Sequence, residues 1–307
     1  MGILSVLRHP TADKRLTLLA LMSIGAVIYF NFVTLFAMSL ATLVTIPHLF
    51  KYTMQKHYIF AVFMFVNTYW NYLMAYFTDT TARRLPKDVW EFHQQQKTKP
   101  VRCYSCKLCG DCIVKRDHHC FFMNTCIGYY NQKYFMWYCL YMSVGTFYSL
   151  ITTAMYNNAV FGTQFNGSTT FFTLGPKTVY LWLVGRAPLG EMILVTYLYV
   201  CLAGGTVCLG FFCWQLWISF MGLTTFEAMH DMPGINNGFY NNMTDVLGKF
   251  WILGAVFPIC LPQHGNGIYG DKFGVMDGAN EVTKKNALKV KKKVENNKRN
   301  NKTKKNN

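Results

Sequence analysis

The stretch Cys109-Gly-Asp-Cys112-Ile-Val-Lys115-Arg116-Asp117-His118-His119-Cys120 gathers thiols, imidazoles and a carboxylate into one short polar run. With Cys106 before it and Cys126 after it, the run offers more sulfur and nitrogen ligands than one tetrahedral zinc ion needs. A surplus cysteine beside a surplus histidine and an aspartate is typical of a nucleophile with its base. The segment also lies between two apolar stretches that are long enough to cross a membrane.

The cysteines of this segment have the spacing of a metal site. They recur at every third position, as Cys103, Cys106, Cys109 and Cys112. A Cys-x-x-Cys pair supplies two zinc ligands from one tight turn, and clustered pairs with histidine indicate metal binding in a reducing compartment. The irregular spacing of the other cysteines does not resemble a secreted disulfide framework.

The run Asp117-His118-His119-Cys120 suggests different roles for its two histidines. Adjacent histidines usually point different ways, so one can bind metal while the other stays free. A carboxylate hydrogen-bonded to the free histidine would fix its tautomer, and that histidine could take the cysteine proton. The alternative is that Cys120 is a further zinc ligand and His118 a surface residue. The residues alone leave both possibilities open.

The composition indicates a polytopic membrane protein. Of 307 residues, 52% are hydrophobic and only 14% are charged, whereas about a quarter is usual in soluble domains. Each membrane span needs about 20 apolar residues. Four stretches qualify: Leu16 to about Met38, Tyr58 to Phe77, Tyr134 to Tyr156, and Met192 to Trp217. The net charge of +16 lies in loops and in the C-terminal tail, which argues against nucleic acid as the partner.

The distribution of Lys and Arg predicts the orientation, because basic loops stay on the cytosolic side. Both termini and the Cys/His segment are therefore expected in the cytosol, and the loops 45–57 and 157–189 in the lumen. The second loop contains the sequon Asn166-Gly-Ser168 on the appropriate side. The first apolar run is too long for a cleavable signal peptide. We divide the chain into 1–78, 79–133, 134–222, 223–285 and a Lys/Asn-rich, disordered tail, 286–307.

The run from Pro100 to Phe135 resembles the cysteine-rich domain of the DHHC protein S-acyltransferases, or palmitoyltransferases. The shared residues are Arg102, Cys106, Cys109, Cys112, Asp117-His118-His119-Cys120, Asn124, Cys126, Gly128, Asn131 and Phe135. Two weaker family features follow the last apolar stretch: Thr224-Thr225-Phe226-Glu227, and the pattern Gly238, Asn242, Val246 and Gly248.

The resemblance implies an all-α integral membrane fold: four transmembrane helices with a cytosolic zinc-binding domain between helices 2 and 3. It implies that Cys120 attacks a long-chain acyl-CoA, usually palmitoyl-CoA, and passes the acyl group to cysteines of proteins at the cytosolic membrane face. His118 would be the general base, oriented by Asp117. The acyl chain would lie among the four helices, with Phe122 at its entrance.

The resemblance also implies a Zn²⁺ site. Its ligands would be Cys106, Cys109, His119 and Cys126, and Cys112 would belong to the family's second site. Candidates for binding the CoA phosphates are Arg102, Lys115 and Arg116, although solvated basic residues are the simpler interpretation of each.

The sequence departs from the family in two places. The second zinc site lacks its upstream cysteine pair and has Ser105 in place of a histidine. Cys103 and His93 would have to replace the missing ligands. The usual Pro-Trp after the catalytic cysteine is Phe121-Phe122. These losses keep open the alternative of a catalytically inactive, zinc-binding membrane scaffold of the same family.

Two other protein classes are disfavoured. A membrane-anchored RING-type ubiquitin ligase needs eight cross-braced ligands, which the segment does not supply. A transporter would need ionisable residues along its spans, and they are scarce. The final Lys304-Lys305-Asn306-Asn307 resembles a dilysine retrieval signal, so we expect endoplasmic reticulum or Golgi membranes.

Overall fold

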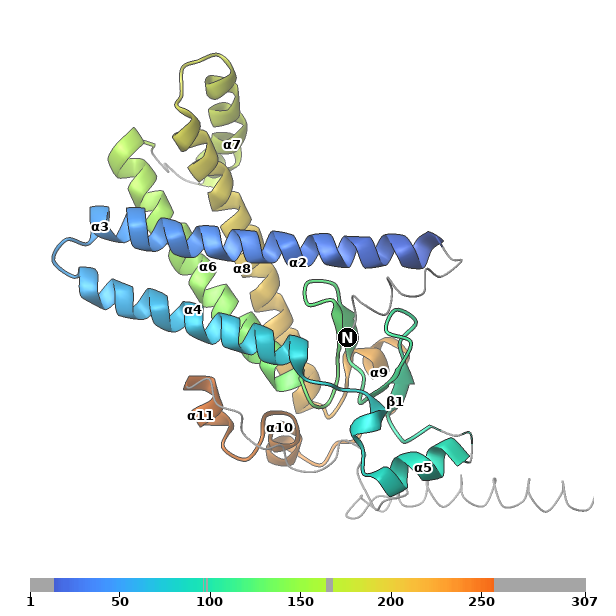
Figure 1. Ribbon diagram of the computed structural model, residues 1–307. Helices are drawn as coiled ribbons and strands as arrows, with labels where there is room; N and C mark the ends of the chain where they lie inside the picture. The colour runs from blue at the N-terminus through green and yellow to red at the C-terminus, as the bar shows by residue number, and fades with distance from the viewer. Residues whose placement is uncertain (1–13, 96, 98, 164–167, 257–307) are drawn as a thin grey trace, which may run out of the picture.

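The computed structural model describes residues 14–95, 97, 99–163 and 168–256, and four long helices dominate this part of the chain (Figure 1). They are α2 (Lys14–Leu40), α4 (Met54–Phe77), α6 (Gln132–Phe161) and α8 (Leu189–Phe220). The first continues without a break through a short π-helical turn, η1 (Ala41–Thr45), into α3 (Ile46–Leu49). The lysine-rich tail, the dilysine pair and the sequon asparagine lie outside the described residues.

Each apolar stretch of the sequence falls on one of these helices, and each helix is longer than its apolar stretch. Helix α6, for example, begins two residues before Tyr134 because Asn131 marks the turn into it. Within the described residues, two helical stretches are long and apolar enough to cross a membrane by composition: Thr17–Leu49 and Leu189–Phe220. Helices α4 and α6 carry more Asn, Thr and Tyr, which lowers their hydropathy.

Helix α6 contacts both α4 and α8, and it also contacts the π-helical turn η1 and helix α3 that continue α2. Several polar side chains inside this bundle bond to their own helix. Thr34 donates to the Phe30 carbonyl and Thr146 to the Met142 carbonyl, both at 2.8 Å, so their hydroxyls need no water. At the end of the bundle nearest Cys120, the aromatic rings of Phe30, Tyr72 and Tyr138 form one buried cluster.

The cysteine-rich segment folds as two small antiparallel hairpins. Strand β1 (Cys103–Ser105) pairs with β2 (Cys112–Val114), and β3 (His118–Cys120) pairs with β4 (Thr125–Ile127). The hairpins follow a 3-10 turn, η2 (Ala82–Arg84), and a short helix, α5 (Lys87–Gln95).

A glycine holds the two hairpins close together. A Cβ atom on Gly128 would meet the Val114 carbonyl oxygen at 2.7 Å and the Thr80 hydroxyl at 2.6 Å, which only glycine avoids.

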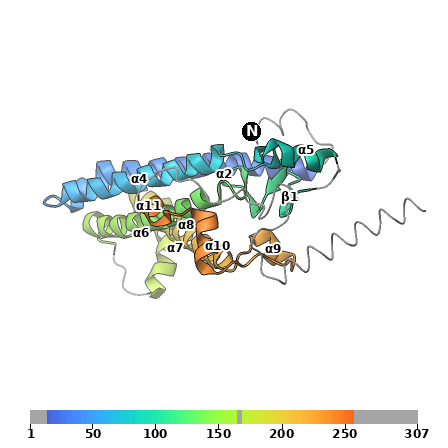
Figure 2. The same cartoon turned by 90° about the horizontal axis from the view of Figure 1, so that it is seen from below.

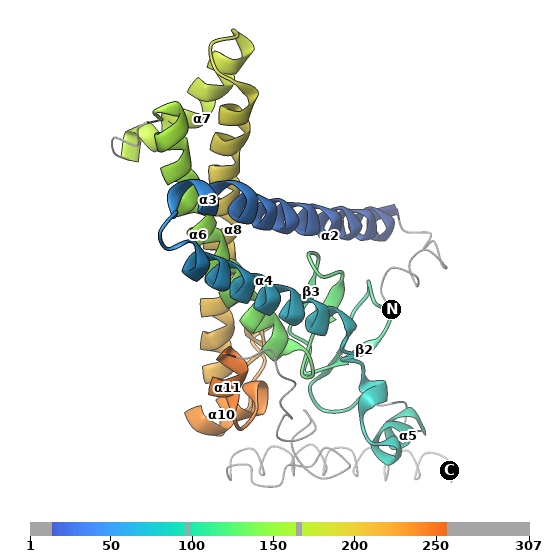
Figure 3. The ribbon, with the colours of Figure 1, turned by 60° about the vertical axis from the view of Figure 1, so that its left-hand side comes forward.

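The chain after α8 returns to the hairpins. Helices α9 (Thr225–Met229), α10 (Phe239–Leu247) and α11 (Trp251–Val256) lie at the hairpin end of α8 (Figures 2 and 3). A capping box begins α9: Thr224 Oγ1 accepts from the Glu227 N–H at 3.1 Å, and the Glu227 carboxylate accepts from the Thr224 N–H at 3.0 Å. At the opposite end of α8, the predicted lumenal loop contains a helix that the sequence analysis did not anticipate, α7 (Ser168–Leu183).

Candidate functional site

The hairpin β3–β4 explains why two adjacent histidines have different surroundings. Successive side chains of a strand point to opposite faces, so His118 and Cys120 share one face and His119 faces the other way. The register places His119 directly opposite Cys126. The strand therefore separates a metal-binding face from a face that carries a thiol and its histidine.

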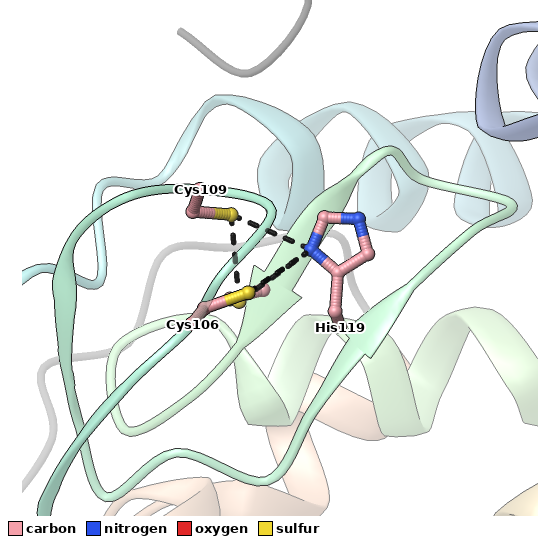
Figure 4. A group of neighbouring side chains, drawn as sticks. Cys106, Cys109 and His119 are labelled. Atoms are coloured by element: carbon pink, nitrogen blue, oxygen red, sulfur yellow. Dashed lines mark hydrogen bonds between the residues drawn. The ribbon is translucent and has the colours of Figure 1, made fainter. Parts of the chain in front are cut away.

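Four ligand atoms converge on the metal-binding face. They belong to Cys106, Cys109, His119 and Cys126, and all lie within 4.8 Å of one another. Figure 4 labels three of these residues, Cys106, Cys109 and His119. The three sulfur atoms are 3.7, 3.4 and 3.6 Å from His119 Nδ1, in the order Cys106, Cys109, Cys126. Zinc at about 2.3 Å from sulfur and about 2.0 Å from nitrogen places tetrahedral ligand atoms about 3.5–3.8 Å apart. The cluster has the donor set and the size for one zinc ion.

Cys112 lies outside this group, and the described residues show no second cluster of the same kind. It is opposite Ser105 on the β1–β2 hairpin and packs beside the buried Cys103. The thiol–thiol hydrogen bond between them, followed by burial, raises the pKa of Cys103 above its ordinary value. His93 is buried on α5 and is not among the grouped ligands. Within the described residues, Cys103, Cys112 and His93 therefore do not form a second group of metal ligands.

On the other face, the Asp117 carboxylate is fully buried and accepts four hydrogen bonds. The donors are His118 Nδ1 at 2.7 Å, Gln215 Nε2 at 2.6 Å, and the Thr225 N–H and hydroxyl at 2.6 and 3.0 Å. Burial raises the pKa of Asp117, but these hydrogen bonds and the charge of His118 outweigh burial, so its pKa falls below the ordinary value. The carboxylate is held ionised and in one orientation.

His118 is positioned between this carboxylate and the Cys120 thiol. In the tautomer that donates from Nδ1 to Asp117, the other ring nitrogen is available to the thiol. Burial lowers the pKa of His118, but the hydrogen bonds to Asp117 and Cys120 raise it to about 10. The raised pKa favours the protonated imidazole, so the pair of Asp117 and His118 stabilises the imidazolium that forms when His118 takes the Cys120 proton. Phe135 packs edge-on against its ring at 5.0 Å.

Cys120 lies at one end of a cavity of about 670 Å³ among the four long helices. Its walls come mainly from apolar and aromatic residues of α2, α4, α6 and α8, and His118 also lines it. Phe121 and Phe122 line the same end and are both exposed. The Cys120 thiol is therefore buried beside a largely apolar cavity.

The three basic residues considered for phosphate binding occupy different surroundings. Arg102 forms a buried ion pair with Glu227, in which Nε lies 2.6 Å from Oε1. Lys115 forms a second buried ion pair with Asp245, at 2.6 Å. Both pairs connect the hairpins to the helices after α8, so these two cations are engaged within the protein. The Arg116 guanidinium lies 5.1 Å from the centre of the Phe226 ring.

Sequence reasoning missed two residues that hold Asp117. Gln215 is a buried amide in the otherwise apolar α8, where such a residue needs a partner, and this was the available signal. Thr225 had been identified only as part of a motif, without a role. Both come from far along the chain, about a hundred residues beyond the carboxylate.

Comparison with known proteins connects this arrangement to one family. Residues 86–232 match the family model described as DHHC palmitoyltransferase. Palmitoyltransferase ZDHHC22 of Mus musculus is 31% identical over 166 residues, which are 54% of this chain and 63% of that protein. Palmitoyltransferase ZDHHC22 of Danio rerio is 36% identical over 155 residues, 50% of this chain and 56% of the relative.

A second group of relatives is more distant. Palmitoyltransferase ZDHHC2 of Homo sapiens is 28% identical over 186 residues, 54% of this chain and 45% of the relative. The chain thus aligns with less than two thirds of the length of the curated relatives named here.

Proposed function

We propose that the chain, whose residues 86–232 match the family model described as DHHC palmitoyltransferase, is a membrane-embedded protein S-acyltransferase. It transfers a long-chain acyl group, palmitoyl in the first instance, from acyl-CoA to cysteines of membrane-associated proteins. The observation that supports this most is the series Asp117, His118 and Cys120 at the mouth of an apolar cavity. A nucleophile, its base and the group that orients the base are all present.

The first half-reaction loads the enzyme. His118 takes the proton from Cys120 Sγ, and the resulting thiolate attacks the thioester carbonyl of acyl-CoA. The bond from that carbon to the CoA sulfur breaks, and His118 returns the proton to the leaving CoA thiolate. Asp117 keeps the imidazole in the required tautomer and stabilises its positive charge. The products are free CoA and an acyl thioester on Cys120.

The second half-reaction unloads it. The thiol of the substrate protein gives its proton to His118 and attacks the acyl carbon. The bond to Cys120 Sγ then breaks, and the proton passes to that sulfur. Because CoA leaves before the substrate reacts, the kinetics are ping-pong.

The cavity supports a long acyl chain as the transferred group. It is apolar, and it begins at the thiol that would carry the acyl group. Each methylene moved from water into such a space contributes about 0.8 kcal/mol. The exposed Phe121 and Phe122 line the entrance, where the family usually has Pro-Trp.

We further propose that all four long helices span the bilayer, with the cysteine-rich segment and both termini in the cytosol. Helices α4 and α6 are long enough for this and pack beside the two more apolar helices. The basic residues between α4 and α6 support the cytosolic side. The Lys pair near the C-terminus supports the endoplasmic reticulum or the Golgi as the location.

We propose that Cys106, Cys109, His119 and Cys126 hold one structural Zn²⁺ per chain, on the basis of their donor set and mutual distances. The ion would hold the two hairpins together and would take no part in acyl transfer.

Metal content tests this site. Purified wild type is expected to contain one zinc per chain by elemental mass spectrometry. Cys126→Ser is expected to lose the zinc and to lower Tm, because ligand binding energy is folding energy in structural zinc sites. The matched control is Cys112→Ser, which lies outside the ligand group and should keep the zinc. Two zinc ions per wild-type chain, or loss of zinc on Cys112→Ser, would contradict the assignment.

Autoacylation tests the function. Wild type in detergent, given palmitoyl-CoA with a labelled acyl chain, is expected to become labelled, and hydroxylamine should remove the label because it cleaves thioesters. Cys120→Ser should abolish hydroxylamine-labile labelling, since an oxygen ester resists this treatment. Cys213→Ser, which changes an exposed cysteine of α8 that does not line the cavity, is the control for the loss of a thiol elsewhere.

The same measurement distinguishes the scaffold alternative. A folded, zinc-loaded wild type that takes up no label from palmitoyl-CoA would overturn the enzyme proposal. The zinc-binding membrane scaffold would then be the function that remains.

A further inference from the structure

Helix α7 has two faces of opposite kind. Leu174 and Thr178 are buried on the face toward α8, at 8% and 2% exposure. The opposite face carries Phe172, Pro176, Val179 and Leu183, whose spacing of four, three and four residues aligns them along one side of a helix. All four are exposed, Phe172 to 75% and Leu183 to 69%. A soluble loop would not present a continuous apolar stripe of this kind to water.

A side chain of α8, the Tyr199 hydroxyl, supplies hydrogen bonds to the backbone of α7 that water would otherwise supply. Pro176 has no N–H and therefore interrupts the hydrogen bonds inside the helix. The Tyr199 hydroxyl of α8 donates to the Phe171 carbonyl and accepts from the Gly175 N–H at 2.9 Å. The Tyr199 hydroxyl thus bridges the Gly175 N–H and the Phe171 carbonyl, the pair one residue before the bond that Pro176 lacks. Within a bilayer, a proline-containing helix is tolerated where a neighbouring helix supplies such partners to its backbone. A Cβ atom on Gly175 would meet the Tyr199 ring at 2.8 Å, so this close approach requires glycine.

The position of Tyr199 along α8 indicates how deep in the bilayer the contact between α7 and α8 lies. Gln215 reaches Asp117 beside the catalytic thiol, so it marks the level of the cytosolic membrane surface. At about 1.5 Å per residue, Tyr199 lies about 24 Å farther along the helix. The hydrocarbon core of a bilayer is about 30 Å thick. With α8 placed across the bilayer, the contact between α7 and α8 therefore falls within the leaflet opposite Cys120, not in the aqueous space beyond it.

The remaining side chains of α7 suit the boundary of that leaflet. Lys177 and Thr173 lie between the two faces and are exposed, so the lysine can extend toward headgroups. Tyr180 and Trp182 are exposed to 63% and 38%, and such aromatic residues gather at membrane interfaces. The apolar surface also continues onto the first turns of α8, where Leu189 is 51% exposed.

We propose that α7 is a membrane-embedded helix that enters the leaflet opposite Cys120 without crossing it. Its stripe of Phe172, Pro176, Val179 and Leu183 contacts phospholipid acyl chains, and Lys177 faces the headgroups. This proposal rests on the placement of the long helices in the bilayer. The segment predicted to be a lumenal loop would then contact lipid through α7.

Photocrosslinking from lipid tests the proposal on the unmodified protein. Full-length wild type is reconstituted into phosphatidylcholine vesicles doped with a phosphatidylcholine that carries a diazirine on one acyl chain. In one arm the diazirine is near the carboxyl end of the chain, and in the other at its terminal methyl end. After illumination and trypsin digestion, mass spectrometry maps the lipid adducts, and the peptide Thr178–Arg186 reports on α7.

Adducts on Thr178–Arg186, stronger from the carboxyl-end probe than from the terminal probe, are the expected result. Adducts on α8 without any on α7 would overturn the proposal and leave the bilayer placement of the long helices intact. Adducts on neither helix would overturn the bilayer placement and this proposal together. Acyl transfer is not used as the readout, so a failure here is distinguishable from a failure of the proposed activity.

A pair of variants tests the stripe itself. The double variant Val179→Asp with Leu183→Asp should lower the adduct yield on α7 by roughly threefold or more, because carboxylates are expelled from the acyl region. Thr173→Asp, at the polar edge of the same helix, is the matched control and should keep the yield. An unchanged yield in the double variant, with α8 adducts retained, would contradict the assignment of the stripe.

Discussion

Replacing His118 with alanine is expected to lower the rate of Cys120 acylation by about 10²–10⁴-fold, the usual contribution of a general base. The imidazole is held by Asp117 at 2.7 Å on one side and meets the Cys120 thiol on the other. Without it, the thiol must ionise unaided, and the leaving CoA thiolate has no proton donor. Pre-steady-state labelling of wild type and His118→Ala with palmitoyl-CoA measures the effect directly.

Two further measurements make this prediction specific. Asp117→Asn keeps the size of the side chain but removes the charge that stabilises the imidazolium, so it should also slow acylation. Zinc content is the control for folding, because the metal ligands lie on the other face of β3. A His118→Ala variant that keeps its zinc and acylates at the wild-type rate would remove His118 from the mechanism.

Breaking the ion pair between Arg102 and Glu227 is expected to reduce the free energy of unfolding by about 3–5 kcal/mol. The two side chains are only 4% and 0% exposed, and they connect the residue before β1 to α9. Arg102→Met leaves the Glu227 carboxylate buried without its cation, which is the source of the cost. Denaturant or thermal unfolding of the purified variants measures the loss.

The double variant Arg102→Met with Glu227→Gln should recover much of this stability. Glutamine can still accept from the Thr224 N–H in the capping box, and no unpaired charge remains. The exposed pair of Arg83 with Asp111, at 2.8 Å, is the matched control, and Arg83→Met should cost at most about 1 kcal/mol. A buried pair that behaves like the exposed one would contradict the structural role assigned to Arg102.

The grouping of the four candidate zinc ligands and the order of Asp117, His118 and Cys120 were predictable because they are local. Cys106 and Cys109 are separated by the length of one turn, and the alternation of a strand sends His119 and Cys120 to opposite faces. The sequence also indicated the four long helices, since apolar runs of sufficient length have few other structures available. The ends of these helices were less predictable, because backbone hydrogen bonding continues beyond the apolar residues.

The environment of each charged residue was not predictable, because its partners lie far away in the sequence. Arg102 and Lys115 were considered for phosphate binding, since spacing alone does not reveal that Glu227 and Asp245 neutralise them. The sequence assigned Cys112 to a metal site, and only the hairpin register places it beside Cys103 and away from the four ligands.

By itself, then, the sequence determined the chemistry of one short segment and the presence of long apolar helices. Hydrophobic periodicity and ligand spacing are patterns of residues close together in the sequence, so both can be recognised without the tertiary structure. Only the tertiary structure decided how the Asp117 carboxylate is held and that α7 packs against α8. Gln215 and Thr225 reach Asp117, and Tyr199 reaches α7, only after the helices have packed. Buried polar groups require partners, but the chain does not state in advance which distant residues will provide them.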